Sequence, residues 1–163
     1  ERRRQFAADV SRECGVAVEP VDQPEAAARG QDIVITATPS AEPVLRGEWL
    51  SEDTHLNVVG SNFLSKAEVD EAAIKRANRI VVDSKDQARI EAGDLVPVLD
   101  VSKPHWADVV ELGAVIVGKA RGRRSEADVT LFKSVGLGIE DVVTAARVYE
   151  AAKAQGVGRA VEW

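Results

Sequence analysis

The stretch "THLNVVGSNFLSKAEVDEAAIKRANRIVVDS" (54–84) decides the fold. Residues 54–61 form an apolar segment that reaches a glycine, which is typical of a strand buried on both faces. Residues 66–78 then place apolar side chains on one helical stripe, and 79–84 are another buried strand. A strand, a helix and a strand in this order predict a parallel sheet covered by helices, the doubly wound α/β arrangement.

The same alternation continues on both sides of this stretch. A short β-branched run occupies 16–21, and residues 32–40 begin with a further apolar strand. We expect three more helices from apolar spacing and from Pro24 and Gly93 at their ends, at 2–13, 23–30 and 85–93.

The regular alternation of strands and helices ends after Leu95. Residues 97–106 contain two prolines and are typical of a connection, and 107–120 mix helix and turn signals. Residues 129–156 then predict a strand, a Ser-Val-Gly turn and a long amphipathic helix, and 157–163 add a last short strand. The expected buried stripe of the long helix consists of Val142, Val143, Ala146, Tyr149 and Ala152.

Composition limits the possible partners. The chain has 163 residues, 45% of them apolar, and a net charge of −6, which suits one acidic domain with a sizeable core. The basic runs at 2–4 and 119–124 are typical of solvated segments, and no apolar run approaches the ~20 residues of a membrane span. Cys14 is the single cysteine, so we expect no disulfide framework, no metal site and a reducing, cytoplasmic location. Nucleic acid and membrane are not expected partners.

The sequence contains no methionine, even at position 1. The chain is therefore expected to be a fragment of a longer protein.

Three segments place small or polar residues at the expected carboxyl ends of strands, where open parallel sheets bind ligands. They are 36–39, 57–60 and 134–136. Their hydroxyls, amide and turn N–H groups suit a nucleotide or an anion. A capped strand end, a buried amide that ties two loops and a capped turn are the structural alternatives.

Taken together, these segments resemble the ornithine cyclodeaminase/mu-crystallin family of nicotinamide-dinucleotide proteins. The resemblance covers about residues 2–158 and rests on "DIVITATPSAEPVL", "GEWLSEDTHLNVVGSN", "KAEVDEAAIKRANRIVVDSKDQARIEAGDL" and "TLFKSVGLGIEDVVTAARVYEAAKAQGVG". It implies a Rossmann-type doubly wound parallel sheet that lacks its first strand and glycine loop. The C-terminal strand and helix would return toward an absent substrate domain.

The resemblance also divides the chain. Residues 1–128 would be a partial Rossmann dinucleotide-binding domain, and 129–163 a strand-turn-helix segment that belongs partly to the substrate and dimerisation domain. The G-x-G-x-x-A/G loop, the residue that selects NAD or NADP and the basic residues for the substrate carboxylate would lie upstream, so the fragment alone is expected to be inactive.

Site residues are carried over from the resemblance by position. Cofactor contacts are implied for Thr36, Ala37, Thr38, Asn57, Val58, Val59, Lys66 and Ser134. The turn residues Val135 and Gly136 are implied to meet the substrate. For Lys66, an exposed lysine at a helix start is the alternative.

Asn62 stands where cyclodeaminases of this family carry an aspartate that shuttles a proton. An amide cannot exchange a proton near pH 7. The resemblance therefore implies an NAD- or NADP-dependent oxidoreductase that reduces an imine or ketimine to an amino acid, or the reverse, with Asn62 orienting the substrate. An ornithine cyclodeaminase and a non-catalytic dinucleotide- or small-ligand-binding protein are the alternatives. The full-length protein would be a homodimer.

Overall fold

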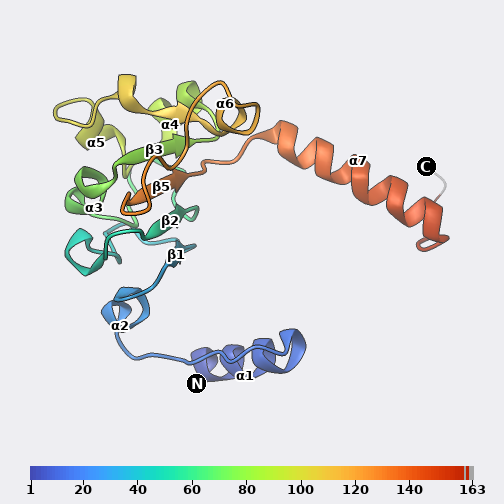
Figure 1. Cartoon of the computed structure of the whole chain (residues 1–163). Helices are drawn as coiled ribbons and strands as arrows, with labels where there is room; N and C mark the ends of the chain where they lie inside the picture. The colour runs from blue at the N-terminus through green and yellow to red at the C-terminus, as the bar shows by residue number, and fades with distance from the viewer. Residues whose placement is uncertain (160, 162–163) are drawn as a thin grey trace.

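The computed structural model describes residues 1–159 and 161, and its centre is a five-stranded, all-parallel sheet (Figure 1). The strand order is β1-β2-β5-β3-β4, so the last strand in the sequence lies in the middle of the sheet. This arrangement confirms the α/β, Rossmann-like class. The strands are β1 (Ile33–Thr36), β2 (His55–Val58), β3 (Arg79–Val82), β4 (Val110–Glu111) and β5 (Thr130–Lys133).

Helices connect the strands largely as the sequence predicts. Three segments differ: 16–21 form no strand, the predicted connection 97–106 contains the short helix α5, and 107–120, expected to mix helix and turn, contains the strand β4. In the predicted last strand, residues 160, 162 and 163 lie outside the described residues, and the described remainder of 157–163 is not a strand. The helices are α1 (Arg2–Cys14), α2 (Pro24–Ala28), α3 (Glu71–Arg76), α4 (Lys85–Glu91), α5 (Val96–Leu99), α6 (Leu112–Ile116) and α7 (Gly138–Gln155), with 3-10 turns η1 (Gly47–Trp49) and η2 (Trp106–Asp108).

Helix α3 begins later than the predicted start at 66. Its N-cap is Asp70, whose carboxylate accepts the N–H of Ala73 at 2.9 Å. The residues before it are held elsewhere, because the N–H groups of Glu68 and Val69 both donate to Asp94. These two bonds replace the helical hydrogen bonds that the apolar spacing predicts.

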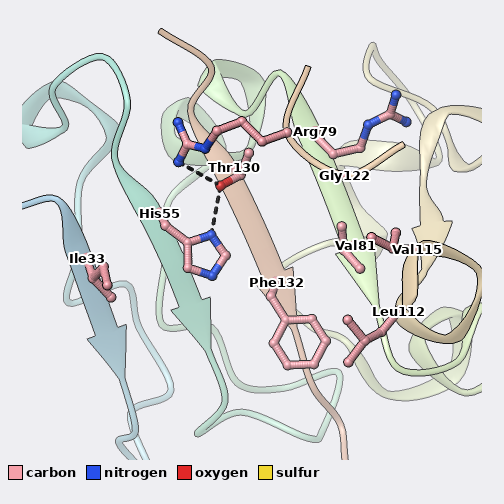
Figure 2. Close-up of a pocket in the computed structure, with 10 residues that line it drawn as sticks. Ile33, His55, Arg79, Val81, Leu112, Val115, Gly122, Thr130 and Phe132 are labelled. Carbon is pink, nitrogen blue, oxygen red and sulfur yellow. Dashed lines mark hydrogen bonds between the residues drawn. The ribbon is translucent and has the colours of Figure 1, made fainter. Parts of the chain in front are cut away.

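The two faces of the sheet differ in how far other segments pack over them. On one of them Ile33 and Ile35 of β1 are more than half exposed, so this apolar strand is buried on one face only, whereas a continuous apolar run would predict burial on both. Within the described residues nothing covers these two side chains. Farther along this face, near β3 and β5, residues Val81, Leu112 and Phe132 line a hollow of about 420 Å³ (Figure 2). We refer to this side as the open face.

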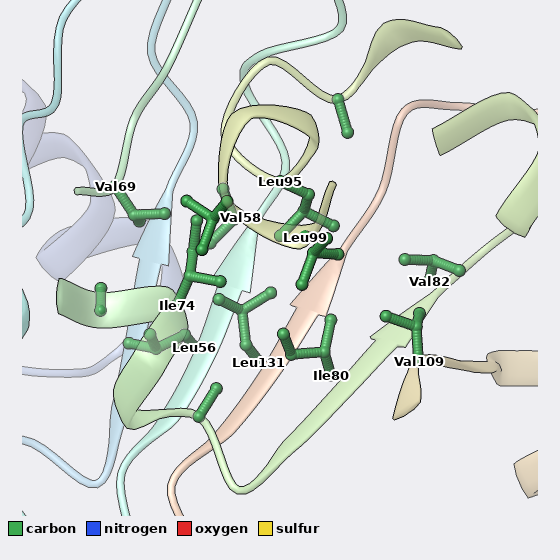
Figure 3. Close-up of a cluster of buried hydrophobic side chains, with 14 of the residues drawn as sticks. Leu56, Val58, Val69, Ile74, Ile80, Val82, Leu95, Leu99, Val109 and Leu131 are labelled. Atoms are coloured by element: carbon green, nitrogen blue, oxygen red, sulfur yellow. The ribbon is translucent and has the colours of Figure 1, made fainter. Parts of the chain in front are cut away.

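The opposite side, the covered face, carries the hydrophobic core (Figure 3). Alternate residues of the strands point into it, as the period of two in a strand requires. Leu56 and Leu131 are fully buried there, against Ile74 of α3 and Leu99 of α5. Further members of the core are Val58, Val69, Ile80, Val82, Leu95 and Val109.

Helix α7 leaves the sheet and extends away from it (Figure 1). Its predicted stripe is not buried: Val142, Val143 and Tyr149 are exposed, as is Ala146, and Ala152 is half-buried. The prediction of burial is wrong for this chain because no described segment packs along the helix. The stripe itself is present, but it lacks a partner surface.

Among the described residues, no helix has both the length and the apolar character needed to cross a bilayer. The same part of the chain contains no group of three or more histidine, cysteine or acidic side chains placed to hold a metal ion.

Candidate functional site at the carboxyl ends of the strands

The three predicted segments lie side by side at one edge of the sheet. Thr36, Val58 and Lys133 are register partners at the ends of β1, β2 and β5. The N–H of Val59 donates to the carbonyl of Thr36 at 2.9 Å, and the N–H of Ser134 donates to the carbonyl of Val58 at 3.2 Å. The loops after these strands therefore form one continuous edge, as expected for parallel strands.

A buried carboxylate, Glu68, holds the first two loops together. It accepts the hydroxyl of Thr36 at 3.1 Å and the backbone N–H groups of Thr38 and Gly60 at 2.5 Å and 2.7 Å. Gly60 is required at this contact, because a Cβ there would lie 2.3 Å from the Thr38 nitrogen and 2.4 Å from Glu68 Oε1. The Thr36 hydroxyl is thus already bonded to Glu68.

A second carboxylate, Asp83 after β3, holds the third loop. It accepts the hydroxyl of Ser134 and the N–H groups of Val135 and Gly136, each at 2.9 Å. Gly136 adopts a φ of 85°, a conformation that favours glycine. These N–H groups are committed to Asp83, so they do not form the anion site that the sequence suggested for this turn.

Three further polar side chains are fully enclosed beneath this edge. We call Ser61, Asp94 and Lys133 the buried ion cluster. The Lys133 ammonium lies 3.1 Å from Asp94 Oδ2, and both side chains have 0% exposure. Lys133 also donates to the Ser61 carbonyl and, at 2.7 Å, to its hydroxyl, which in turn donates to Asp94. Asp94 is thus enclosed, although a polar residue just after a helix and a glycine is typical of a solvated position.

The other predicted site residues differ in how accessible they are. Asn62, Ala37 and Val59 are exposed on the loops. By contrast, Val58 and Val135 are buried in the core, so that a ligand can reach only their backbone.

Two further predicted contacts, Lys66 and Asn57, are half-buried. Lys66 is half-buried, with its ammonium 5.0 Å from the centre of the Phe63 ring. Asn57 is half-buried and pairs in register with Ile35, so its side chain belongs to the open face. All ten predicted contacts and Asn62 stay predictions as ligand contacts.

A hollow of about 360 Å³ lies beside β1. Thr36 and Thr38 line it together with apolar side chains that include Ala28, Val34 and Leu45. It is large enough for part of a small ligand.

His55 lies outside this edge, on the open face. Its Nδ1 is 2.7 Å from the hydroxyl of Thr130 (Figure 2). Burial lowers the pKa of His55 below its usual value; a hydrogen bond with Asn57 opposes this effect, and the charge of Arg123 adds to it. Burial thus favours the neutral imidazole.

Sequence reasoning did not find Glu68, Asp94 or Lys133. A signal was present for the lysine, because Lys133 follows Leu131 by two positions and so shares its face of the strand. For the acids no local signal exists, since their partners lie 8 to 33 residues away in sequence.

The family model for ornithine cyclodeaminase/mu-crystallin proteins matches residues 1–156 of the chain. The chain belongs to this family. One curated relative, Delta(1)-pyrroline-2-carboxylate reductase of Bacillus cereus, is 38% identical over 164 residues, which cover 100% of this chain and 50% of the relative. The chain therefore spans about half the length of the relatives it matches.

Solved structures of the family have the same fold. The Thermococcus litoralis Delta(1)-pyrroline-2-carboxylate reductase, in complex with NADH and L-proline, matches with a TM-score of 0.88 and 35% identity, over 97% of this chain and 49% of its own. An archaeal alanine dehydrogenase dimer with bound NAD matches with a TM-score of 0.83 and 34% identity, over 98% of this chain and 49% of its own. Both likenesses extend over almost the entire chain.

Proposed function

We propose that the complete protein carrying this chain is an NAD(P)-dependent oxidoreductase that reduces an imine to an amino acid, or catalyses the reverse oxidation. The likeness to a reductase solved with NADH and L-proline, over 97% of this chain, carries the proposal. The position of the predicted segments on one edge of a parallel sheet supports it.

The chemistry of this edge fits the nicotinamide end of such a cofactor better than its phosphates. The loop N–H groups are bonded to Glu68 and Asp83, and these carboxylates disfavour a nearby phosphate. The exposed side chains of these loops, such as Ala37 and Val59, are neutral. Ser134 donates its hydroxyl proton to Asp83 and accepts the N–H of Gly136 at 3.2 Å, so its oxygen keeps one lone pair for a carboxamide N–H.

The chain's own residues would act mainly by orientation. When bound, a reduced nicotinamide would supply the hydride to the carbon of an iminium, whose nitrogen already carries the proton that the product amine keeps. The protein must hold the two reactants in contact, which is where most of the rate gain of such a step arises. Asn62, exposed beside the fully buried Ser61, can donate and accept hydrogen bonds to a substrate but cannot carry a proton near neutral pH. This favours reduction over cyclodeamination.

The proposal includes three properties of the complete protein: a homodimer, a cytoplasmic location, and residues 129–163 partly belonging to its substrate and dimerisation domain. The exposed apolar side chains of α7 support the last point. The alanine dehydrogenase neighbour is described as a dimer, and a single free cysteine suits a reducing compartment.

The test uses the complete protein. NADH and NADPH oxidation are followed against a panel of cyclic imines and of 2-oxo acids with amines, with ammonia release from ornithine measured in parallel. We expect imine-dependent oxidation without ammonia release. Ammonia release without net oxidation would identify a cyclodeaminase instead, and cofactor binding without turnover would identify a binding protein.

The variant Asn62→Ala sharpens the test. Losing one orienting hydrogen bond, worth about 1 kcal/mol, lowers kcat/KM for the imine roughly five- to tenfold. Asn62→Asp introduces a group that can carry a proton. We expect this variant to release no ammonia from ornithine, because the proposed reaction is a reduction and includes no loss of ammonia. A gain would assign the cyclodeaminase reaction to this site.

A further inference from the structure

The buried ion cluster is unusual for a position that packing alone would fill. Lys133 ends the central strand β5 and faces the core beside Leu131. A fully buried lysine is rare, and replacing a buried ion pair by apolar side chains of similar volume is often neutral or stabilising. Packing therefore does not require a charge here. A methionine could fill the same space, but it would lack the hydrogen bonds of the ammonium group.

Those contacts join two separate loops. Lys133 donates to both the carbonyl and the hydroxyl of Ser61, which lies 72 residues earlier in the loop after β2. Asp94 completes the connection, because it accepts the Ser61 hydroxyl and the N–H groups of Glu68 and Val69, the latter at 3.1 Å. The side chain of one strand thus holds a neighbouring loop at two atoms of Ser61, the backbone carbonyl oxygen and the hydroxyl oxygen.

Each end of this tether is next to a residue of the candidate site. Ser61 directly precedes Asn62, and Lys133 directly precedes Ser134. Ser134 is held on its other side, because its hydroxyl donates to Asp83 at the end of β3. The relative positions of Asn62 and Ser134 are therefore set by a chain of contacts from β2 through β5 to β3.

We infer that Lys133 is a positioning residue for the reaction. It touches neither substrate nor cofactor. Through Ser61 it holds the Asn62 loop at a fixed distance from the Ser134 turn, and so aligns the imine with the nicotinamide. The inference rests on the proposed function for its reacting partners, whereas the tether itself follows from the contacts above.

The test needs a variant that removes the tether without leaving a charge buried. Lys133→Met alone leaves Asp94 unpaired, which threatens folding. In the double variant Lys133→Met/Asp94→Asn both charges are removed, while the Asn oxygen still accepts the N–H groups of Glu68 and Val69. Asp70→Asn is the matched control: this carboxylate also accepts two backbone N–H groups, from Gly47 and Ala73, in the turn before α3.

Amide hydrogen exchange measures the tether in the complete protein. In the double variant we expect exchange of residues 59–64 to rise at least tenfold, with 45–50 and 71–76 unchanged. In the Asp70→Asn control all three segments should keep their exchange rates, because the Asn oxygen still accepts the N–H groups of Gly47 and Ala73. Unchanged exchange at 59–64 in the double variant would overturn the tether, whether or not the protein is an imine reductase.

Kinetics of the same proteins measure the alignment. The double variant should lose at least tenfold in kcat for imine-dependent NADH oxidation, with KM for the imine changed less than threefold. Its primary isotope effect with deuterated NADH should rise, because misalignment slows the hydride step. The control should keep kcat within twofold and the isotope effect unchanged. Faster exchange at 59–64 with kcat and isotope effect unchanged would overturn the positioning role.

If the unmodified protein shows no imine-dependent oxidation, the proposed function fails, and with it the alignment step. The exchange measurement still decides whether Lys133 tethers the loop.

Discussion

The two faces of the sheet differ strongly in burial, although the strands contribute apolar side chains to both. Leu131, on the covered face, is fully buried, whereas Ile35, on the open face, is 64% exposed. Both belong to short β-branched or apolar strands of a parallel sheet. An apolar strand pattern therefore indicates only that its side chains favour burial. Which face is actually buried depends on the segments that pack against it.

The largest expected effect tests the difference in burial between the two faces directly. In the 163-residue chain, Leu131→Ala should lower the free energy of unfolding by about 3 kcal/mol, because it opens a cavity in a packed core. Ile35→Ala should change it by no more than about 0.5 kcal/mol, as is usual for an exposed position. Urea unfolding monitored by circular dichroism measures both. Similar losses in the two variants would mean that the open face is covered in solution, and a dependence on protein concentration would identify self-association.

The second prediction extends the comparison to polar groups. Glu68→Ala should cost about 2–3 kcal/mol, because the N–H groups of Thr38 and Gly60 lose their buried acceptor. Glu71→Ala is the matched control: its carboxylate is exposed and pairs with Lys75, one turn along α3, which is worth about 0.5 kcal/mol. Denaturant unfolding gives the two values. A loss for Glu68→Ala as small as the control's would mean that water replaces the carboxylate.

The strands and the longer helices could be predicted from the sequence because their signals are local. The spacing of apolar residues marks β1, β2, β3 and β5 within a few positions, and the amphipathic pattern marks α7. The central place of β5 is not local, since its neighbours in the sheet end 72 and 48 residues before it begins.

The candidate site was predictable only in part for the same reason. The positions of its loops follow from the rule that ligands bind at the carboxyl ends of parallel strands. The acids that hold those loops do not: Asp94 follows a helix and Glu68 precedes one, and each resembles a solvated residue in sequence. Only the fold brings them under the edge, where the loop N–H groups need acceptors.

The third prediction compares a buried loop with a more exposed one. Asp83→Ala removes the acceptor of the Ser134–Gly136 turn, as Glu68→Ala does for its loops. Because Gly136 is exposed, water can partly replace the carboxylate, so the loss should be only about 1 kcal/mol. Amide exchange at Val135 and Gly136 should nevertheless accelerate. A loss as large as that of Glu68→Ala would show that this turn is as closed to water as the first two loops.

The smallest expected effect concerns the open face and pH. The pKa of His55 is lowered in the folded chain, mainly by burial, so the unfolded chain binds the proton more readily. By linkage, the stabilising effect is complete above the unfolded value of about 6.5 and is lost as the pH falls from there through the folded pKa. His55→Gln should therefore flatten the decline in unfolding free energy between about pH 7 and pH 5. Urea unfolding at a series of pH values measures the slope.

The size of this slope also tests how open the face is. His55 is only half-buried, and its Nδ1 faces the Thr130 hydroxyl, so the imidazole retains part of its hydration. The difference between the two proteins should then be smaller than any of the losses above. A steep dependence that His55→Gln abolishes would mean that the ring is desolvated in solution, and hence that a segment or a second copy covers the hollow it lines. An unchanged slope in His55→Gln would assign the decline to carboxylates instead.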